Sequence, residues 1–228
     1  MSEITGFPPD SPARPGCAPS PMYRRMVSSE LYQADDEAIA RENARGWEIM
    51  RRYNATGPSE DAARAALLKN LLGHVGANVT IRPPFYVDYG RHISVGDHVF
   101  MNWNCQILDT APVVIGDYTQ LAPGVTLATA HHPIDPVARG AYWECGDPIT
   151  IGKNVWLGTN VVVLPGVTIG DNTVVGAGSI VTRDLPANVV AVGSPARVVR
   201  DITEADRVPA SKLPADATLD YAAYPDLA

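Results

Sequence analysis

The chain has 228 residues with a formal net charge of −7, and 46% of the residues are hydrophobic, which suits a globular protein of one large domain or two small ones. The acidic balance gives no support to nucleic-acid binding, which usually needs a basic face, and no apolar run reaches the roughly eighteen residues of a membrane-spanning helix. The N-terminus also lacks the charged and apolar regions of a signal peptide.

The three cysteines, Cys17, Cys105 and Cys145, are odd in number and scattered through the chain. This usage indicates reduced thiols and therefore a cytoplasmic protein. Metal-binding spacing such as CxxC is absent, so we expect no required metal.

The N-terminal part is predicted to hold a flexible extension and then a helical cap. Residues 1–21 are rich in proline and small polar residues, which is typical of a flexible extension. Residues 22–73 read as the cap. Its first helix is capped by Asp35 or Asp36 and runs to about Tyr53, with these residues on or near one face: Ile39, Trp47, Met50 and Tyr53.

A second helix is predicted after the Thr56-Gly57-Pro58 stretch. Ser59 is its expected N-cap, and Glu60 and Asp61 in its first turn favour the positive end of the helix dipole. Its apolar face would consist of Leu67, Leu68, Leu71 and Leu72, and Gly73 would end it. Two amphipathic helices before a repeat suit a lid over its open end.

A six-residue repeat dominates the rest of the chain. Between Ile151 and Val181 an aliphatic residue begins every block of six, and glycine often follows it; the block heads are Ile151, Leu157, Val163, Ile169, Val175 and Val181. A period of six fits neither a helix nor an ordinary half-buried strand and is typical of a parallel β-helix, in which three blocks form one coil. The pattern therefore predicts a mainly β fold over residues 74–202, in which stacked coils bury a shared core.

The earlier repeats, over 79–127, are less regular. Ile107 and Ile115 are eight residues apart, so two extra residues occupy a corner near Asp109-Thr110. His92 and His98 lie on adjacent faces, and we interpret both as surface or turn residues.

Residues 128–150 interrupt the repeat and predict a protruding loop, which in a compact domain is usually functional. Its His132 suits a general base because an unperturbed imidazole titrates near neutral pH. The alternative, equally open from the residues alone, is that His131 and His132 are turn residues before Pro133 and have no catalytic role.

Three arginines gather where the repeat ends. Arg183, Arg197 and Arg200 can meet phosphates through charge-assisted hydrogen bonds, or they can simply form a solvated end of the solenoid. From residue 203 to 228 the sequence reads as a loosely ordered tail.

Four motifs carry a resemblance to a known family: N-V-W-L-G at 154–158, P-G-V-T-I-G-D-N at 165–172, G-A-G-S-I-V-T at 176–182 and G-S-P-A-R at 193–197. The chain resembles the hexapeptide-repeat acyltransferases, and more narrowly the maltose and galactoside O-acetyltransferase group. Further matching segments are 31–36, 88–90, 102–104 and 132–136. The resemblance covers about residues 22–202.

The resemblance implies a left-handed parallel β-helix with an N-terminal α-helical cap, assembled as a homotrimer with active sites between subunits. It implies that His132 removes the proton of an acceptor hydroxyl, whose oxygen attacks acetyl-CoA directly, without an acyl-enzyme. Asn102 would orient the reacting groups. The backbone N–H of Thr159 would stabilise the oxyanion, a contribution typically of about 3–4 kcal/mol.

The same resemblance implies the binding residues. Acceptor contacts fall on Asp88, Asn102, Glu144 and Asp35 or Asp36. Thr110 stands where galactoside-type members carry an acid, which leaves the sugar open. Contacts with acetyl-CoA fall on Trp156, Thr159, Ala177, Thr182, Arg183, Arg197 and Arg200. Trp156 can equally be a packed residue of a flat face.

Three alternatives stay open. The first is an acetyltransferase of the same fold for another acceptor, an antibiotic or serine. The second is a zinc enzyme similar to the gamma-class carbonic anhydrases, which needs three histidine ligands in a spacing that this sequence lacks. The third is a non-catalytic β-helix. We expect no nucleic-acid or membrane partner.

Overall fold

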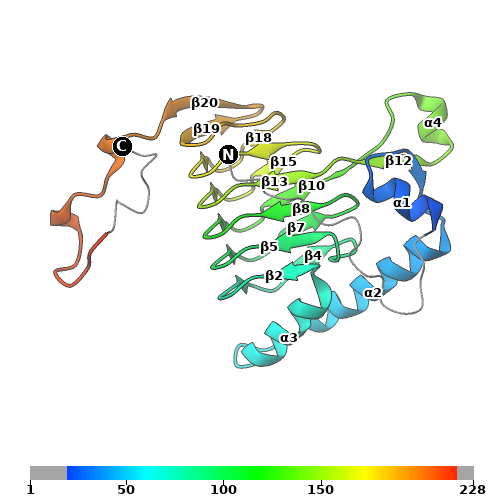
Figure 1. The fold of residues 1–228 in the computed structure, drawn as a ribbon, viewed down its shortest axis with the longest axis horizontal. Helices are drawn as coiled ribbons and strands as arrows, with labels where there is room; N and C mark the ends of the chain where they lie inside the picture. The colour runs from blue at the N-terminus through cyan, green and yellow to red at the C-terminus, as the bar shows by residue number, and fades with distance from the viewer. Residues whose placement is uncertain (1–19, 220–228) are drawn as a thin grey trace.

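The computed structural model describes residues 20–219, and these form a solenoid of parallel strands with helices at one end (Figure 1). The chain passes repeatedly over three faces, and each face is one sheet. The first face consists of β2 (His74–Val75), β5 (Ile93–Val95), β8 (Val113–Ile115), β13 (Ile149–Ile151) and β16 (Thr168–Ile169). The predicted mainly β, parallel β-helical fold is confirmed.

The other two faces repeat this stacking. The second face consists of β3 (Thr80–Ile81), β6 (Phe100–Met101), β9 (Gln120–Leu121), β14 (Trp156–Leu157), β17 (Val174–Val175), β19 (Val189–Gly193) and β20 (Ala196–Asp201). The third face consists of β4 (Phe85–Val87), β7 (Cys105–Leu108), β10 (Thr126–Ala128), β15 (Val162–Val163) and β18 (Ile180–Val181).

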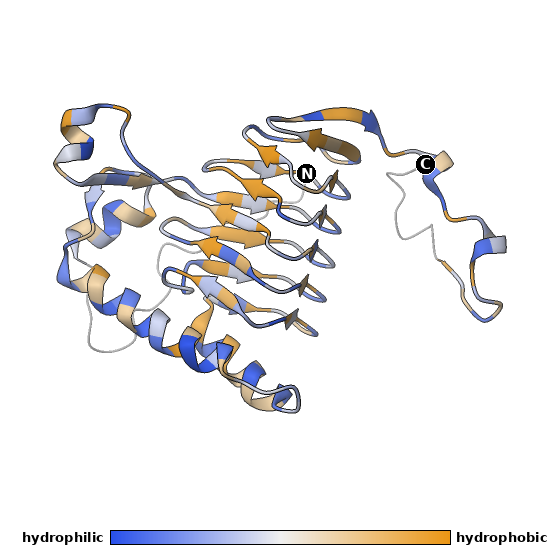
Figure 2. Cartoon of the chain, turned by 180° about the vertical axis from the view of Figure 1, so that it is seen from behind, coloured by the Kyte–Doolittle hydropathy of each residue, from blue (hydrophilic) through white to orange (hydrophobic). Residues whose placement is uncertain are grey.

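The block heads of the repeat form the core. Ile151, Leu157 and Val163 are at most 1% exposed, as are Ile169, Val175 and Val181. Figure 2 shows the strands mostly in the hydrophobic colour and the turns between them in hydrophilic or neutral colours. Burying a side chain of this size stabilises a fold by roughly 1.5–3 kcal/mol, and the gain is shared because each head stacks on its counterpart in the next coil.

The turns of successive coils fix one another. The Asp171 carboxylate accepts a hydrogen bond from the Lys153 backbone N–H at 2.7 Å. Two coils earlier, the Asp117 carboxylate accepts one from the Asp97 backbone N–H. A Cβ at Gly152 would lie 2.3 Å from the Asp171 carboxylate. Gly152 is therefore required by the aspartate of the next coil, whereas Gly158 and Gly170 are required by the close approach of the next coil's backbone, at Ala177 and Ala187.

Three helices begin the described chain: α1 (Pro21–Val27), α2 (Glu37–Asn54) and α3 (Asp61–Leu71). Asp36 caps α2 by accepting from the N–H groups of Ala38 and Ile39, as predicted. Met50 of α2 and Leu71 of α3 belong to the same buried cluster as Ile81 of the first coil. The two longer helices thus cover the N-terminal end of the solenoid (Figure 1).

Two predictions about these helices are wrong. Ser59 does not cap α3; the N-cap is Glu60, because the Glu60 side chain accepts from the Gly57 N–H and closes a turn before the helix. Trp47 is 61% exposed. At about 100° per residue, Gly46 rather than Trp47 shares the face of Ile39, and Gly46 packs against the Tyr89 backbone.

The interruption of the repeat is an ordered excursion that leaves after β10 and returns at β13. It contains β11 (Ala130–His131), α4 (Pro136–Gly140) and β12 (Trp143–Gly146). Strand β12 pairs antiparallel with β11 and also with β1 (Tyr32–Gln33) of the N-terminal part. The excursion and the cap are therefore joined in one small sheet.

The far end of the solenoid is closed by β19 and β20, which form an antiparallel pair. Two short 3-10 helices follow, η1 (Glu204–Asp206) and η2 (Ala210–Lys212). The extension predicted for 1–21 lies outside the described residues except for Ser20 and Pro21, which begin α1, and the tail prediction lies outside them from residue 220. No helix in the described range has the length and apolar character needed to cross a membrane.

Candidate active site

The predicted site residues occupy two different corners of the solenoid. Asn102, Thr159 and Ala177 follow β6, β14 and β17, so they lie where the chain turns from the second face to the third. Asp88 and Thr110 follow β4 and β7, where the chain leaves the third face. The excursion with His132 leaves at that same corner. A whole face therefore separates the two groups within one chain.

The His132 side chain is exposed and follows β11 directly. Within residues 20–219 it has no hydrogen-bond or ion-pair partner. Its neighbour His131 is instead held by Asp147, with 2.9 Å between His131 Nε2 and Asp147 Oδ2. Of the two histidines, only His132 has no side-chain partner among residues 20–219.

An acidic cluster lies beside the excursion and consists of Asp88, Asp109 and Glu144. Burial, followed by the charges of Asp109 and Glu144, raises the pKa of Asp88 to about 6. Glu144 accepts a hydrogen bond from the buried Tyr32 hydroxyl at 3.0 Å. Burial, with the Glu144 charge as the next cause, raises the pKa of Tyr32 above its usual range and keeps the phenol protonated.

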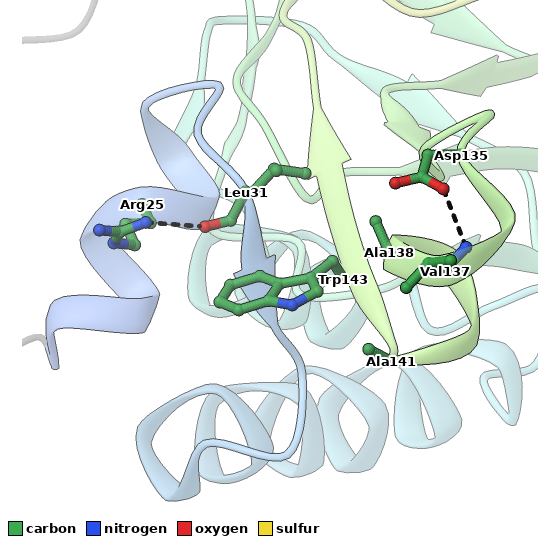
Figure 3. Close-up of a pocket in the computed structure, with 7 residues that line it drawn as sticks. All are labelled: Arg25, Leu31, Asp135, Val137, Ala138, Ala141 and Trp143. Atoms are coloured by element: carbon green, nitrogen blue, oxygen red, sulfur yellow. Dashed lines mark hydrogen bonds between the residues drawn. The ribbon is translucent and has the colours of Figure 1, made fainter.

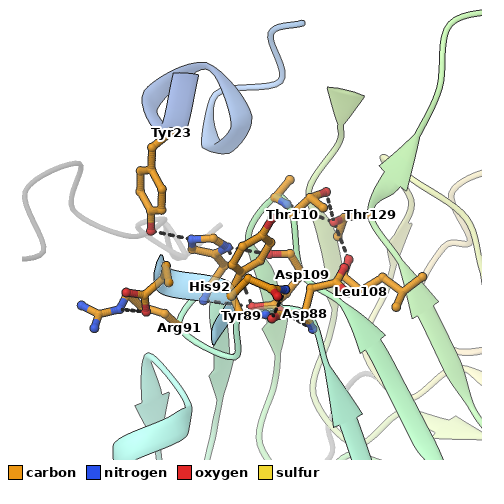
Figure 4. A network of polar contacts seen from close by, with 12 residues as sticks. Tyr23, Asp88, Tyr89, Arg91, His92, Leu108, Asp109, Thr110 and Thr129 are labelled. Carbon is orange, nitrogen blue, oxygen red and sulfur yellow. Dashed lines mark hydrogen bonds and ion pairs between the residues drawn. The ribbon is translucent and has the colours of Figure 1, made fainter. Parts of the chain in front are cut away.

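Asp109 holds this corner together (Figure 4). Its Oδ1 accepts from the backbone N–H groups of Asp88 and Tyr89 at 3.1 and 2.9 Å, and its Oδ2 accepts from that of His92 at 3.3 Å. Burial raises the pKa of Asp109 to about 7, although these hydrogen bonds oppose the shift. The two extra residues predicted at this corner thus include the side chain that positions Asp88.

His92 lies in a turn, as predicted, but it is buried and not on the surface, whereas His98 is exposed in a turn. His92 Nδ1 meets the Asp109 carbonyl oxygen, and Nε2 lies 2.7 Å from the Tyr23 hydroxyl. Burial lowers the pKa of His92 to about 4, so the ring is neutral; its Nδ1–H donates to Asp109 and its Nε2 accepts from Tyr23. Helix α1 thus covers His92 through the side chain of Tyr23.

Two predicted acceptor-binding residues differ in their exposure to solvent. Thr110 is 4% exposed, and its hydroxyl lies 3.0 Å from that of Thr129. Asp35 is exposed beside the capping residue Asp36. Their contacts with an acceptor stay predictions.

The predicted acetyl-CoA residues line one edge and the far end of the solenoid. Trp156 is 55% exposed, so it is not packed within its own chain, and Thr159 and Ala177 are exposed one coil apart. Thr182, Arg183 and Arg197 are exposed near the far end. Arg200 makes two hydrogen bonds to Asp206, at 2.7 and 2.8 Å, so part of its charge is already balanced.

A pocket of about 360 Å³ lies between the N-terminal part and α4 (Figure 3). Arg25 and Leu31 line one side, and Val137 and Trp143 line the other. None of the predicted catalytic residues borders it. We interpret it as the joint between α1 and the excursion rather than as the reaction centre.

Several residues of the site were missed by sequence reasoning. Tyr32 lies in a segment matched to the family and Asp109 at the corner with two extra residues, but their contacts with Glu144 and Asp88 are long-range and were not predicted. Cys145 lies opposite His131 in the β11–β12 pair. Together with Asp147 these side chains form a group of potential metal ligands in the described chain, with ligand atoms within 4.8 Å of one another.

The chain matches two family models: the maltose acetyltransferase hexapeptide capping motif over residues 25–76, and the bacterial transferase hexapeptide over residues 148–183. It is 43% identical to the galactoside O-acetyltransferase of Escherichia coli over 82% of this chain and 92% of that protein. It is 48% identical to nodulation protein L of Rhizobium meliloti over 76% of this chain and 95% of that protein.

Solved structures agree with these matches. A maltose O-acetyltransferase from Clostridium difficile superposes with a TM-score of 0.79 at 41% identity, covering 81% of this chain and 98% of that one. A galactoside acetyltransferase in complex with coenzyme A gives a TM-score of 0.80 at 43% identity, covering 82% and 94%. The chain belongs to the hexapeptide-repeat acyltransferases, in the maltose and galactoside O-acetyltransferase group.

Proposed function

We propose that this protein transfers an acetyl group from acetyl-CoA to a hydroxyl of a sugar. The observation that carries the proposal is the imidazole of His132, which is exposed and has no partner among the described residues, on an ordered excursion that also contributes Glu144 to the acidic cluster with Asp88 and Asp109. Membership of the family supports the reaction, and the relatives named for galactoside and maltose support a sugar acceptor. The solved complex of one relative with coenzyme A supports acetyl-CoA as the donor.

In the proposed mechanism His132 takes the proton of the acceptor hydroxyl while its oxygen attacks the thioester carbonyl carbon. The new C–O bond forms and the C–S bond breaks, and the proton on His132 passes to the departing thiolate of CoA. The Thr159 backbone N–H donates to the carbonyl oxygen as negative charge develops there. Asn102 orients the acceptor. No acyl-enzyme is formed.

We propose a homotrimer in which each active site lies between two subunits. The separation of His132 and Asp88 from Asn102 and Thr159 by a whole face of the solenoid supports this assembly. One chain alone presents the base at one corner and the oxyanion donor at another. A neighbouring copy that places its second corner against the excursion would complete the site.

The acceptor end is proposed to bind hydroxyl groups through Asp88 and Glu144, with Asp35 and Thr110 as further contacts. Carboxylates accept hydrogen bonds from sugar hydroxyls, and charge-assisted hydrogen bonds are about twice as strong as neutral ones. A cytoplasmic location is supported by Cys105 and Cys145, which are unpaired in the described chain.

Complementation between two inactive variants tests both the chemistry and the assembly. His132→Ala and Asn102→Ala are each expected to lower kcat by at least about 100-fold. In mixed trimers some sites receive His132 from one chain and Asn102 from the other, so co-expression should restore part of the activity, read as free thiol released from acetyl-CoA. Full activity of His132→Ala alone would refute the mechanism.

The acceptor is tested separately by a screen against glucosides, galactosides, maltose, chitin fragments and serine. His98→Ala serves as the matched control, because this exposed histidine lies outside the site. Turnover of serine or an antibiotic in preference to every sugar would favour the alternative acceptor class.

A further inference from the structure

The neck of the excursion brings three different metal-ligating side chains to one place. In the antiparallel pair of β11 and β12, His131 lies directly opposite Cys145, so their side chains leave the ribbon on the same face. Asp147 is two residues beyond Cys145 and shares that face. The three ligand atoms all lie within 4.8 Å of one another.

The backbone holds these side chains in position. The Asp147 N–H donates to the Thr129 carbonyl at 2.9 Å and closes the base of the excursion. Gly146 is wedged against the Thr110 side chain, where a Cβ would lie 2.4 Å from its hydroxyl oxygen. Ligands fixed by strand pairing and packing are the arrangement that a metal site needs before the ion arrives.

The donor set selects the ion. Zinc accepts imidazole nitrogen, thiolate sulfur and carboxylate oxygen, at about 2.0–2.1, 2.3 and 2.0–2.2 Å respectively. An open zinc site has three protein ligands and a water in the fourth position. The His131 and Asp147 side chains are each 40% exposed, so an ion from solvent can reach them. Ligand contraction by roughly 1 Å would bring all three into zinc distance.

We propose that His131, Cys145 and Asp147 bind one zinc ion per chain at the neck of the excursion. The ion replaces the direct contact between His131 and Asp147 and ties β11 to the far end of β12. His132, the next residue, leaves the ribbon on the opposite face, so it is not a ligand. The ion is a clamp on the excursion and takes no part in acetyl transfer.

Metal titration of the full chain tests the proposal. After treatment with a chelator, addition of Co²⁺ as a spectroscopic probe is expected to give thiolate-to-cobalt charge-transfer absorption that saturates at one ion per chain, and Zn²⁺ should bleach it. Zn²⁺ should also raise Tm, because an ion that binds only the folded chain stabilises it.

Matched variants locate the site. Cys145→Ser should abolish the charge-transfer absorption, and His131→Gln and Asp147→Asn should each weaken Zn²⁺ binding by on the order of 100-fold. Cys17→Ser, Cys105→Ala and His98→Gln should leave both unchanged. If Cys145→Ser does not fold, as judged by circular dichroism of the metal-free chain, His131→Gln and Asp147→Asn still decide the assignment.

The proposal of a zinc site and the proposal of acetyl transfer can be refuted separately. His132→Ala should bind Co²⁺ with unchanged affinity while losing acetyl transfer. The zinc site would be overturned by saturation with fewer than one ion per chain, or by an unchanged affinity for Zn²⁺ in both His131→Gln and Cys145→Ser. In that case His131 and Asp147 form only an ion pair.

Discussion

The Tyr32 hydroxyl lies 3.0 Å from the Glu144 carboxylate, although 112 residues separate them in the chain. Tyr32 belongs to β1 of the N-terminal part and Glu144 to β12 of the excursion, where the two residues are direct partners in the antiparallel pair. The contact aims Glu144 at the corner that carries Asp88. The N-terminal part thus helps to shape the proposed acceptor site.

Replacing Tyr32 by Phe should weaken acceptor binding without affecting acetyl-CoA. The variant removes the donor to Glu144, and a hydrogen bond to a charged group contributes about 1.5–3 kcal/mol, so the acceptor KM should rise about 10-fold or more while the acetyl-CoA KM stays constant. Steady-state kinetics with each substrate varied in turn measures this. Tyr86→Phe, on an exposed side chain of the third face, is the control. Equal changes in both KM values would mean that Tyr32 acts on the fold as a whole.

Acceptor binding should depend on pH through Asp88. Its pKa of about 6 means that the carboxyl gains a proton as the pH falls through 6, and a protonated carboxyl is a weaker acceptor of sugar hydroxyls. The acceptor KM should therefore rise on acidification between about pH 7 and 5. Asp88→Asn should show a high KM that is flat over this range. A wild-type KM that is independent of pH would remove Asp88 from the acceptor site.

His92 and Asp109 should influence stability with opposite signs. The unfolded chain binds a proton at His92 near pH 6.5 but the folded chain only near 4, so this group makes the free energy of unfolding fall as the pH drops from 6.5 to 4. The pKa of Asp109 is about 7 in the folded chain and 3.8 in the unfolded chain. The folded chain therefore binds the proton first on acidification, and this group makes the free energy of unfolding rise as the pH drops from 7 to about 4. Each slope is at most about 1.4 kcal/mol per pH unit.

Urea unfolding as a function of pH separates the two groups. Wild type should show a shallow slope between pH 4 and 6.5. Asp109→Asn should lose stability on acidification, and His92→Gln should gain it. The prediction fails if both variants keep the wild-type slope.

The glycines after the block heads should be intolerant of a methyl group wherever the next coil presents an aspartate. Gly152→Ala would place Cβ 2.3 Å from Asp171, whereas Gly140 in α4 has no atom within 4 Å of its Cβ position. Gly152→Ala should cost about 1–3 kcal/mol of stability, as overpacking usually does, and lower Tm by several degrees. Gly140→Ala should leave Tm unchanged or slightly raised. Thermal unfolding followed by circular dichroism compares them.

Asp206 should compete with coenzyme A for Arg200. Asp206→Asn breaks the paired hydrogen bonds to Arg200 and should lower the acetyl-CoA KM a few-fold at low salt, an effect that fades as salt screens exposed charges. Arg200→Gln should raise the same KM. Glu204→Gln, which removes the charge of a residue that forms an ion pair with Arg207, is the control. An unchanged KM in both Asp206→Asn and Arg200→Gln would remove Arg200 from the proposed donor site.

The solenoid could be predicted from the sequence because its signal is periodic and local. Every head from Ile151 to Val181 stands in the core, since stacking requires an aliphatic side chain at that place in each coil. The α2 cap at Asp36 was predictable for the same reason, as the capping residue and the N–H groups it serves are neighbours in sequence.

The corner of the site could not be predicted because its contacts are long-range. His92 is buried by Tyr23, 69 residues away, and His131 meets Asp147 only because β12 returns beside β11. Strand β1 lies outside the six-residue repeat, so no period marks it in the sequence. The hydrogen bonds of Asp109 likewise join it to Asp88, Tyr89 and His92, which lie 17–21 residues away in the chain.

The excursion leaves the solenoid without disturbing its register. Strand β13 pairs directly with β8, with Ile149 opposite Val113, so residues 129–148 do not alter the register of the solenoid. The hydrogen bond between the Asp147 N–H and the Thr129 carbonyl joins the two ends of this segment. We therefore expect that the excursion can be replaced by that of a relative without unfolding the solenoid. Grafting it, together with β1, from a relative with another acceptor should transfer the preference for that acceptor, because both segments border Glu144 and the register of the solenoid does not depend on the excursion.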